Sequence, residues 1–180
     1  MNRANAFFIS KKFWIISCCI LAFLVLLFVF MPIKKTLTFQ DLYSGEILAY
    51  VPIEEGQSFQ LEYTHSIHRS TVIDTYKIIS DNRIQQTTLQ YEDMAIGMPS
   101  GALFEEETFV EKDGKYFIEN MNRVFPSINL STSQVVVSHK LNVRNNQYEL
   151  HEYIAPGSFI TIEVRKLTIF QLMKGVNMNG

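Results

Sequence analysis

The chain has 180 residues, of which 47% are hydrophobic, and it carries a formal net charge of −2 at neutral pH. The charge is divided unevenly, with net +5 over residues 1–35 and net −7 over residues 36–180. An acidic segment of this size repels the phosphates of nucleic acids and of anionic membranes. A nucleic-acid-binding role is therefore disfavoured, and no nucleic-acid partner is expected.

The first predicted element is a transmembrane helix over residues 13–33, a stretch without any charged side chain. About 20 apolar residues in a helix are enough to cross the hydrocarbon core of a bilayer. The stretch is longer than the apolar part of a typical signal peptide, and small residues at a cleavage-site spacing are missing, which favours an uncleaved signal-anchor. Basic residues, which mark the cytoplasmic flank, stand on both sides of the stretch: Arg3, Lys11 and Lys12 before it, and Lys34 and Lys35 after it.

The surplus of basic residues before the stretch predicts a single-pass protein of the cytoplasmic membrane. Residues 1–12 would lie in the cytoplasm, and residues 36–180 would form a domain outside it. Both cysteines, Cys18 and Cys19, lie in the apolar stretch. The domain therefore has neither a disulfide nor a cysteine-containing zinc site, and its hydrophobic core must hold it together.

Alternation of apolar and polar residues with a period of two dominates the rest of the chain and predicts β-strands. Pairs rich in Gly, Asn and Asp separate these strands, as is typical of all-β folds. The sequence thus predicts a single antiparallel β-sandwich or partly open barrel. The tail, residues 166–180, fits either an extension of the last strand or one or two helical turns. The predicted strands are 37–43, 46–52, 58–67, 71–79, 83–91, 105–112, 115–119, 134–143, 147–154 and 158–165.

Two histidines near the end of the third predicted strand, His65 and His68, are three residues apart and fall on opposite faces of a regular strand. In that geometry they cannot bind one metal ion together. A hairpin that turns about Arg69 and Ser70 places His65 opposite Asp74 on the apolar face of the sheet.

A second hairpin, turning about Asn145 and Asn146, places His139 opposite Glu152 on a mainly apolar face. Each histidine then has a carboxylate partner, as burial of a charge requires. Three interpretations stay open at this point: two structural hydrogen bonds, a polar pocket that binds a ligand, or a metal site of two histidines and a carboxylate.

Other catalytic signals are weak. Ser66 follows the first histidine in sequence but points to the opposite face of the strand, and a Gly-x-Ser-x-Gly elbow is missing. The loop 92–104 contains Gly97 and Pro99, and it is either a crossover between strands or a segment that covers a ligand. The acidic run 105–107 is expected to be a solvated edge.

Three segments resemble a bacterial family called domain of unknown function 1850: "YTHSIHRSTVIDTY" (63–76), "AIGMP" (95–99) and "SHKLNVRNNQYELHEYIAPGSFITIEV" (138–164). Members of that family show a Tyr-x-His-Ser segment, a later acidic residue, a Gly-x-Pro loop, a His-x-Leu strand and a Gly before the last strand. The resemblance covers about residues 45–165. Departures are an Asp where the family usually has Glu, and a Glu152 that matches no family motif. The corresponding residues are Tyr63, His65, Ser66, Asp74, Gly97, Pro99, His139, Leu141 and Gly157.

The resemblance implies a small exported or membrane-anchored protein whose genes often lie near those of tripartite ATP-independent periplasmic (TRAP) transporters. The expected function is a non-enzymatic accessory or binding domain, with a transporter permease or a solute-binding protein as partner and with no cofactor or metal. The alternatives are a metal-assisted hydrolase using His65, His139 and a carboxylate, or a purely structural envelope protein. The expected functional patch comprises Tyr63, His65, Ser66, Asp74, Gly97, Pro99, His139 and Glu152.

Overall fold

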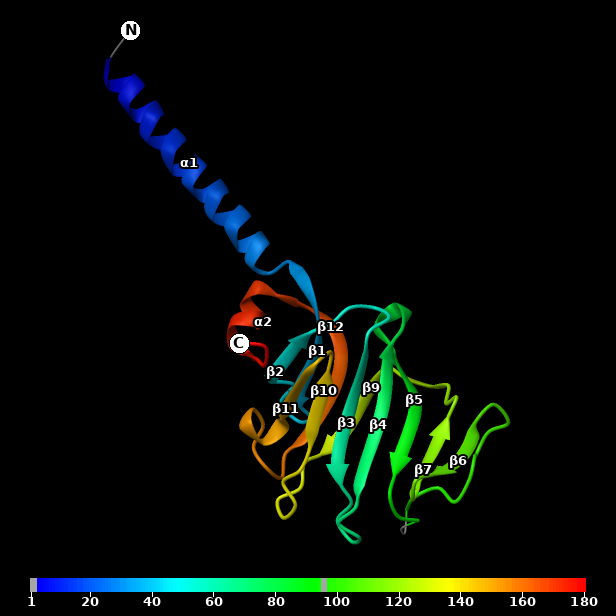
Figure 1. The fold of residues 1–180 in the computed structure, drawn as a ribbon. Coiled ribbons are helices and arrows are strands. Elements are labelled where there is room, and N and C mark those ends of the chain that lie inside the picture. Colours follow the sequence, from blue (N-terminus) through cyan, green and yellow to red (C-terminus); the bar gives the residue numbers. More distant parts are fainter. Residues whose placement is uncertain (1–2, 95–96) are drawn as a thin grey trace.

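A long apolar helix projects away from a β-domain in the computed structural model, which describes residues 3–94 and 97–180 (Figure 1). The helix α1 spans Arg3–Val29, and its segment Lys11–Val29 is long and apolar enough to cross a membrane. By length and composition this helix would suit a membrane anchor or a signal sequence. The predicted span of residues 13–33 ends too late, because the helix stops at Val29 and Pro32 already begins the first strand.

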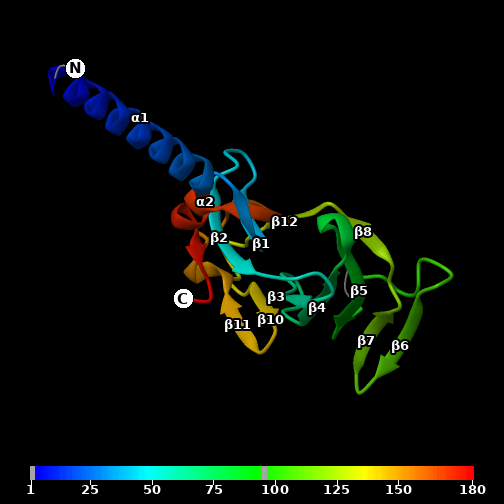
Figure 2. The same cartoon turned by 90° about the horizontal axis from the view of Figure 1, so that it is seen from above.

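The domain consists of two open sheets, so the predicted all-β sandwich is confirmed and neither sheet closes into a barrel (Figures 1 and 2). The five-stranded sheet has the order β13-β2-β1-β12-β9, with β13 (Val176–Asn177), β2 (Ile47–Pro52), β1 (Pro32–Asp41), β12 (Phe159–Thr168) and β9 (Ser127–Ser131). The eight-stranded sheet has the order β11-β10-β3-β4-β5-β7-β6, with β11 (Asn146–Glu149), β10 (Lys140–Val143), β3 (Ser58–Thr64), β4 (Thr71–Ile78), β5 (Ile84–Tyr91), β7 (Lys115–Glu119) and β6 (Thr108–Lys112), while β8 (Arg123–Phe125) pairs with β5.

The main hydrophobic core lies between the two sheets. Because side chains alternate along a strand, every second residue of each inner strand enters this core. The five-stranded sheet contributes Leu37, Phe39, Val51, Ile160 and Ile162, and the eight-stranded sheet contributes Phe59, Leu61, Tyr76, Ile78, Leu141 and Val143.

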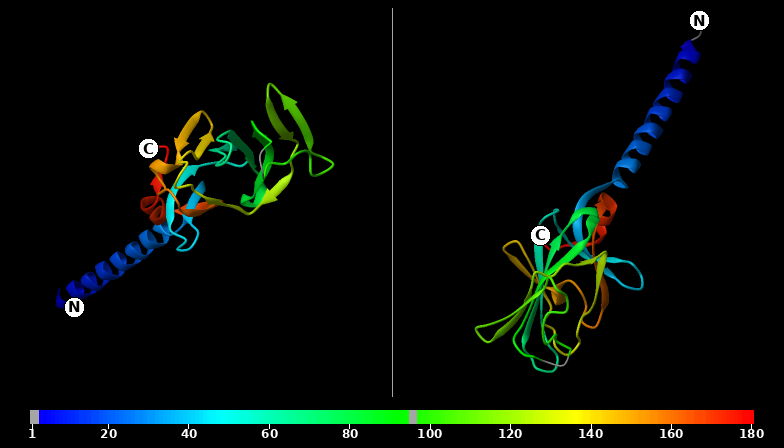
Figure 3. Two further views of the ribbon diagram at one scale, coloured as in Figure 1. Left: turned by 90° about the horizontal axis from the view of Figure 1, so that it is seen from below. Right: turned by 90° about the vertical axis from the view of Figure 1, so that its right-hand side faces the viewer.

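A second, smaller cluster lies further along the eight-stranded sheet, where the β6–β7 hairpin projects away from the five-stranded sheet (Figures 2 and 3). Met98, from the loop after β5, packs against it. The two clusters share one face of the large sheet, and polar side chains occupy that face between them. The buried members of the second cluster are Val72, Leu89, Tyr91, Ile118 and Met121.

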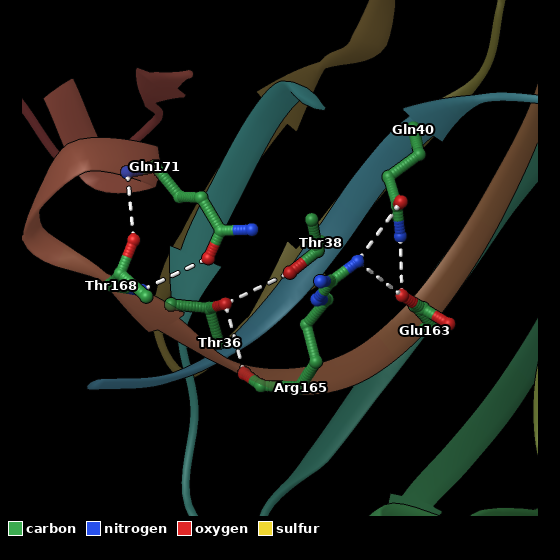
Figure 4. Close-up of polar contacts among 7 residues, drawn as sticks. All are labelled: Thr36, Thr38, Gln40, Glu163, Arg165, Thr168 and Gln171. Carbon is green, nitrogen blue, oxygen red and sulfur yellow. Dashed lines mark hydrogen bonds and ion pairs between the residues drawn. The ribbon is translucent and has the colours of Figure 1, made fainter. Parts of the chain in front are cut away.

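The opposite face of β1 carries polar side chains that are nevertheless buried (Figure 4). Thr36 and Thr38 share a hydrogen bond of 2.9 Å between their hydroxyls. Gln40 binds both Glu163 and Arg165 of the neighbouring strand β12. These bonds satisfy polar groups that burial would otherwise make costly.

Several predicted strand boundaries were wrong. The strand predicted at 134–143 forms only over Lys140–Val143, and Val135 in the preceding loop is 92% exposed. The strand predicted at 147–154 ends at Glu149, where a 3₁₀ turn, Leu150–Glu152, begins. The short strands β8 and β9 were not predicted, since three to five residues give little periodicity.

The tail adopts both alternatives that its sequence allowed. Strand β12 continues to Thr168, and helix α2 (Ile169–Lys174) then begins. A capping box starts the helix: the Thr168 hydroxyl accepts from the backbone N–H of Gln171, whose side chain accepts from the backbone N–H of Thr168 (Figure 4). Strand β13 then returns the chain to pair in parallel with β2.

Candidate functional site

The centre of the β3–β4 hairpin lies two residues earlier in the chain than predicted. The backbone N–H of His65 donates to the carbonyl oxygen of Ser70 over 2.8 Å, so these two residues face each other across the end of the ladder. The loop consists of residues 66–69, and Arg69 adopts a positive φ of 54° that lets four residues reverse the chain.

This closure makes the predicted pairing of His65 with Asp74 wrong. Asp74 lies opposite Leu61, four residues along the strand from the predicted partner. At about 3.3 Å per residue, this offset is about 13 Å. The shift is even, so His65 and Asp74 keep the same face of the sheet, but they are too far apart for a hydrogen bond.

The predicted pairing of His139 with Glu152 is also wrong. The β10–β11 hairpin turns at Arg144 and Asn145, where Arg144 has a φ of 56°. The carbonyl of His139 accepts from the backbone N–H of Leu150, and the chain then enters the 3₁₀ turn. Glu152 is therefore exposed and lies in the 3₁₀ turn beyond the end of the ladder that was predicted to hold it.

His139 instead contacts Tyr63. Their rings stack with centroids 5.7 Å apart and planes inclined by 19°. Residue 139 directly precedes β10, whose Lys140 pairs with Glu62 of β3, so the register of this ladder brings the two rings side by side. Both side chains are half-buried, and burial lowers the pKa of His139. The imidazole is thus kept mainly neutral near neutral pH.

Asp74 lies at the centre of β4, between the two hydrophobic clusters. Its carboxylate accepts a hydrogen bond of 2.6 Å from Nε2 of Gln86 on β5. Burial raises the pKa of Asp74 to about 6, while the hydrogen bond from Gln86 and the charge of Arg123 oppose that rise. The carboxyl group therefore titrates near neutral pH.

The negative charge of this carboxylate affects the pKa values of two tyrosines. Burial and the negative charge of Asp74 raise the pKa of Tyr63 to about 12. The same two causes, with Tyr63 as a further contributor, raise the pKa of Tyr76. Both phenols stay protonated and remain hydrogen-bond donors. We refer to Tyr63, Asp74, Tyr76, Gln86 and His139 as the Asp74 cluster.

Arg123 is close enough to influence Asp74 but forms its ion pair elsewhere. Its Nε and a terminal nitrogen contact the two carboxylate oxygens of Glu107 at 2.9 and 3.1 Å. The Glu107 side chain is 2% exposed, so the prediction of a solvated edge at 105–107 is wrong at this residue. Burial pushes the pKa of Glu107 up, but hydrogen bonds from the Leu103 N–H and from Arg123 outweigh burial and hold the pKa below its usual value.

The remaining predicted residues lie around the β3–β4 hairpin loop. His65 is half-buried, and its Nδ1 atom is buried without a hydrogen-bond partner. Because strand β3 ends at Thr64, His68 belongs to the loop and its ring lies 5.9 Å from that of His65. The prediction that alternation separates the two rings was therefore wrong. Ser66 is exposed in the same loop.

The loop 92–104 contacts the second hydrophobic cluster. The Tyr91 hydroxyl donates to the carbonyl of Pro99, and Gly97 is exposed at a φ of 93°. Residues 95–96, part of the predicted family motif, lie outside the described residues. Met98 of this loop packs against the second hydrophobic cluster, as Tyr63 of the Asp74 cluster also does.

Within residues 3–94 and 97–180, no three side chains of His, Cys, Asp and Glu come together as a metal ion would require. Sequence reasoning found Tyr63, Asp74 and His139 but missed Gln86, Arg123 and Glu107. Gln86 carries a usable signal, because a glutamine at an inward position of a strand, two residues from Ile84, requires a polar partner. No local signal pairs Arg123 with Glu107.

The fold and this cluster define a single β-sandwich domain, preceded by an apolar helix, with a polar cluster set between two hydrophobic ones. Residues 59–150 match the family described as domain of unknown function (DUF1850), and the chain belongs to that family. The match covers the eight-stranded sheet apart from Ser58, the first residue of β3, and it includes the whole Asp74 cluster. No curated protein and no solved structure matches the chain.

Proposed function

We propose that this protein is a membrane-anchored accessory domain that binds a component of a TRAP-type solute transporter outside the cytoplasmic membrane of a bacterium. Helix α1 would be the retained anchor, with residues 1–12 in the cytoplasm and residues 36–180 outside. The association with a TRAP transporter is drawn from the resemblance to the family, and the binding role is drawn from the Asp74 cluster.

The observation that supports the binding role is that the partly buried carboxylate of Asp74 has an amide, and no cation, as its hydrogen-bond partner in the part of the chain that the structure describes. A half-buried carboxylate costs free energy unless a cation neutralises it. Arg123, whose charge acts on Asp74, is engaged by Glu107, and the amide of Gln86 is the hydrogen-bond partner of Asp74. Groups held in such a costly state gather at functional sites, because a bound partner can supply the missing interaction.

The neighbours of Asp74 suit recognition by a polar or cationic group. The phenols of Tyr63 and Tyr76 are close enough to Asp74 to respond to its charge, and the imidazole of His139 stacks on Tyr63. The group therefore combines aromatic rings and hydrogen-bonding tips with one titratable carboxylate. Aromatic rings of this kind provide contact area and polar ends together. A lysine or arginine side chain of a transporter component would neutralise Asp74 and stack on Tyr63.

The hydrolase alternative receives less support from the same geometry. His65 lies about 13 Å along the strand from Asp74, and His139 faces an aromatic ring instead of a carboxylate. General base catalysis requires a base within hydrogen-bond reach of its orienting group. The structural alternative predicts that Asp74 contributes to stability, whereas a raised pKa means that its ionised form weakens the fold.

The test uses the full chain, co-expressed with the permease and the solute-binding protein of a TRAP transporter from the same bacterium. A photoreactive p-azidophenylalanine replaces Tyr63 in one variant and Tyr43, which is 78% exposed in the β1–β2 turn, in the control. We expect crosslinks to a transporter component from position 63 and not from position 43.

The substitution Asp74→Asn, combined with the crosslinker at position 63, should reduce that product severalfold because the charge is lost while the shape is kept. If the chain stays in the membrane fraction but position 63 yields no transporter crosslink, the accessory role is wrong. If the chain is soluble after cell lysis, the anchor is wrong.

A further inference from the structure

A cavity of about 480 Å³ opens where the β-domain meets the end of helix α1. Its walls come from the residue that follows the helix, the β1–β2 turn and helix α2. Figures 1 and 3 show α2 beside the end of α1, where the chain passes into β1. The cavity is distinct from the Asp74 cluster, which lies on the other sheet. Its lining includes Phe30, Glu46, Ile47, Phe170 and Lys174.

The length of helix α1 sets the position of this cavity relative to the bilayer. The segment Lys11–Val29 has 19 residues, which at 1.5 Å per residue span about 28 Å, close to the thickness of the hydrocarbon core. Phe30 follows directly and packs on Phe170 of α2, with ring centroids 5.5 Å apart. When α1 spans a bilayer, the cavity therefore lies at the level of the lipid head groups.

The surface around the cavity is apolar where it faces the membrane. Met173 of α2 is 70% exposed, and Phe170 and Phe30 are also exposed. Exposed apolar side chains next to a membrane helix contact the boundary between acyl chains and head groups. This surface would be costly in water but is stabilised at that depth.

Two opposite charges line the cavity without neutralising each other. The Lys174 ammonium group lies over the Phe170 ring, 4.9 Å from its centroid, and Glu46 extends from the β1–β2 turn. Both side chains belong to the described part of the chain, and they form no ion pair with each other there. A cavity with a separated cation and anion fits a ligand that itself carries both charges.

We propose that this cavity binds the head group of an ethanolamine phospholipid from the membrane that holds α1. The lipid phosphate would accept from the ammonium group of Lys174, and the lipid ammonium group would donate to the carboxylate of Glu46. The upper part of the acyl chains would lie against Phe30 and Phe170. This inference rests on the proposed function, because it requires α1 to be a membrane anchor.

The test places the full chain in nanodiscs of phosphatidylcholine that contain equal minor amounts of phosphatidylethanolamine and phosphatidylglycerol. Native mass spectrometry of the released protein then measures which lipids remain bound. We expect phosphatidylethanolamine to be enriched about fivefold over phosphatidylglycerol, as suits two partly solvated charge contacts.

The double variant Glu46→Gln/Lys174→Gln should lose this enrichment. The matched control Lys140→Gln/Glu149→Gln also removes one cation and one anion, from an ion pair of 3.5 Å on the eight-stranded sheet, and should keep it. Equal retention of phosphatidylethanolamine and phosphatidylglycerol, or enrichment that survives in the cavity variant, would overturn the proposal.

Enrichment of phosphatidylcholine to the same degree as phosphatidylethanolamine would also overturn it, because a quaternary ammonium group cannot donate to Glu46. Extraction of cell membranes with alkaline carbonate tests the membrane anchor separately from the lipid site. Release of the chain would refute the anchor and the lipid site together. Retention of the chain without lipid selectivity would refute the lipid site alone.

Discussion

The imidazole of His139 stacks on the phenol ring of Tyr63, at a centroid distance of 5.7 Å and an inclination of 19°. The two residues are 76 positions apart in the chain, and the pairing of β10 with β3 brings them together. The stack joins His139 to the polar side chains around Asp74, because the phenol of Tyr63 responds electrostatically to that carboxylate. The Asp74 cluster is therefore one connected group, and its members should respond to one another's substitution.

The first prediction concerns the pH dependence that Asp74 gives to folding. The pKa of Asp74 is about 6 in the folded chain, against 3.8 in the unfolded chain. Between pH 3.8 and pH 6, the folded chain therefore retains a proton that the unfolded chain has lost. Stability from this group is present below pH 3.8 and is lost as the pH rises through about 6. Asp74→Asn should raise the free energy of unfolding at pH 7 by about 2 kcal/mol.

Urea unfolding of the full chain in detergent, repeated between pH 4 and pH 8, measures this effect. The variant should lack the decline of the wild type between those limits. A less stable Asp74→Asn variant at pH 7 would show that the carboxylate is a structural group, in agreement with the structural alternative.

The second prediction concerns the stack itself. His139→Phe keeps a flat ring on Tyr63, whereas His139→Ala removes it, so the alanine variant should be less stable than the phenylalanine variant by about 1 kcal/mol or more. The comparison cancels the loss of the polar imidazole nitrogens, which is common to both. Equal stability of the two variants would mean that the ring contact contributes nothing.

The third prediction follows from the lowered pKa of His139. The unfolded chain binds a proton near the usual value of 6.5, and the folded chain binds it only at lower pH. Stability from this group is therefore present above pH 6.5 and declines as the pH falls. An NMR titration of the ring protons should place the His139 midpoint below 6.5, and His139→Phe should remove the acid-side decline.

The fourth prediction concerns the ion pair beside the cluster. Arg123→Gln leaves the buried carboxylate of Glu107 without its cation and should lower the free energy of unfolding by about 2 kcal/mol. Because the charge of Arg123 also lowers the pKa of Asp74, the same variant should raise that pKa above 6. Carbon-13 NMR of the aspartate side chains measures the shift, and an unchanged Asp74 midpoint would contradict the proximity of the two groups.

The fifth prediction concerns Gly157, at the turn before β12. Its φ of 83° is unfavourable for other residues, and a Cβ atom there would lie 2.3 Å from the amide nitrogen of Gln134. Gly157→Ala should cost about 2 kcal/mol in the free energy of unfolding. Gly56 has nearly the same φ, 84°, but open space around it, so Gly56→Ala measures the backbone strain alone. Equal costs for the two variants would show that the contact with Gln134 is relieved freely.

Much of the fold could be predicted from the sequence because it depends on local patterns. An uncharged stretch of about 20 residues marks α1, and alternation of apolar residues marks the strands and their inward faces. Tyr63 and Asp74 were correctly assigned to one face of the large sheet. Even the wrong registers preserved these faces, since both hairpins shifted by an even number of residues.

The partners of those residues could not be predicted in this way. Asp74 was expected to face His65 but faces Leu61, because the loop 66–69 closes earlier than a two-residue turn would. Arg123 meets Glu107 only because β8 returns to pair with β5, and neither the short strand nor the return leaves a periodic signal.

The sequence by itself determined the anchor-like helix, the all-β class, the family and the face on which each strand residue lies, since these depend on composition and on the two-residue repeat of an extended backbone. Only the tertiary structure decided that His139 stacks on Tyr63, that Asp74 has an amide in place of an imidazole, and that a charged cavity adjoins α1. Such contacts depend on where loops close and which strands pair, and those choices are settled by packing across the whole domain.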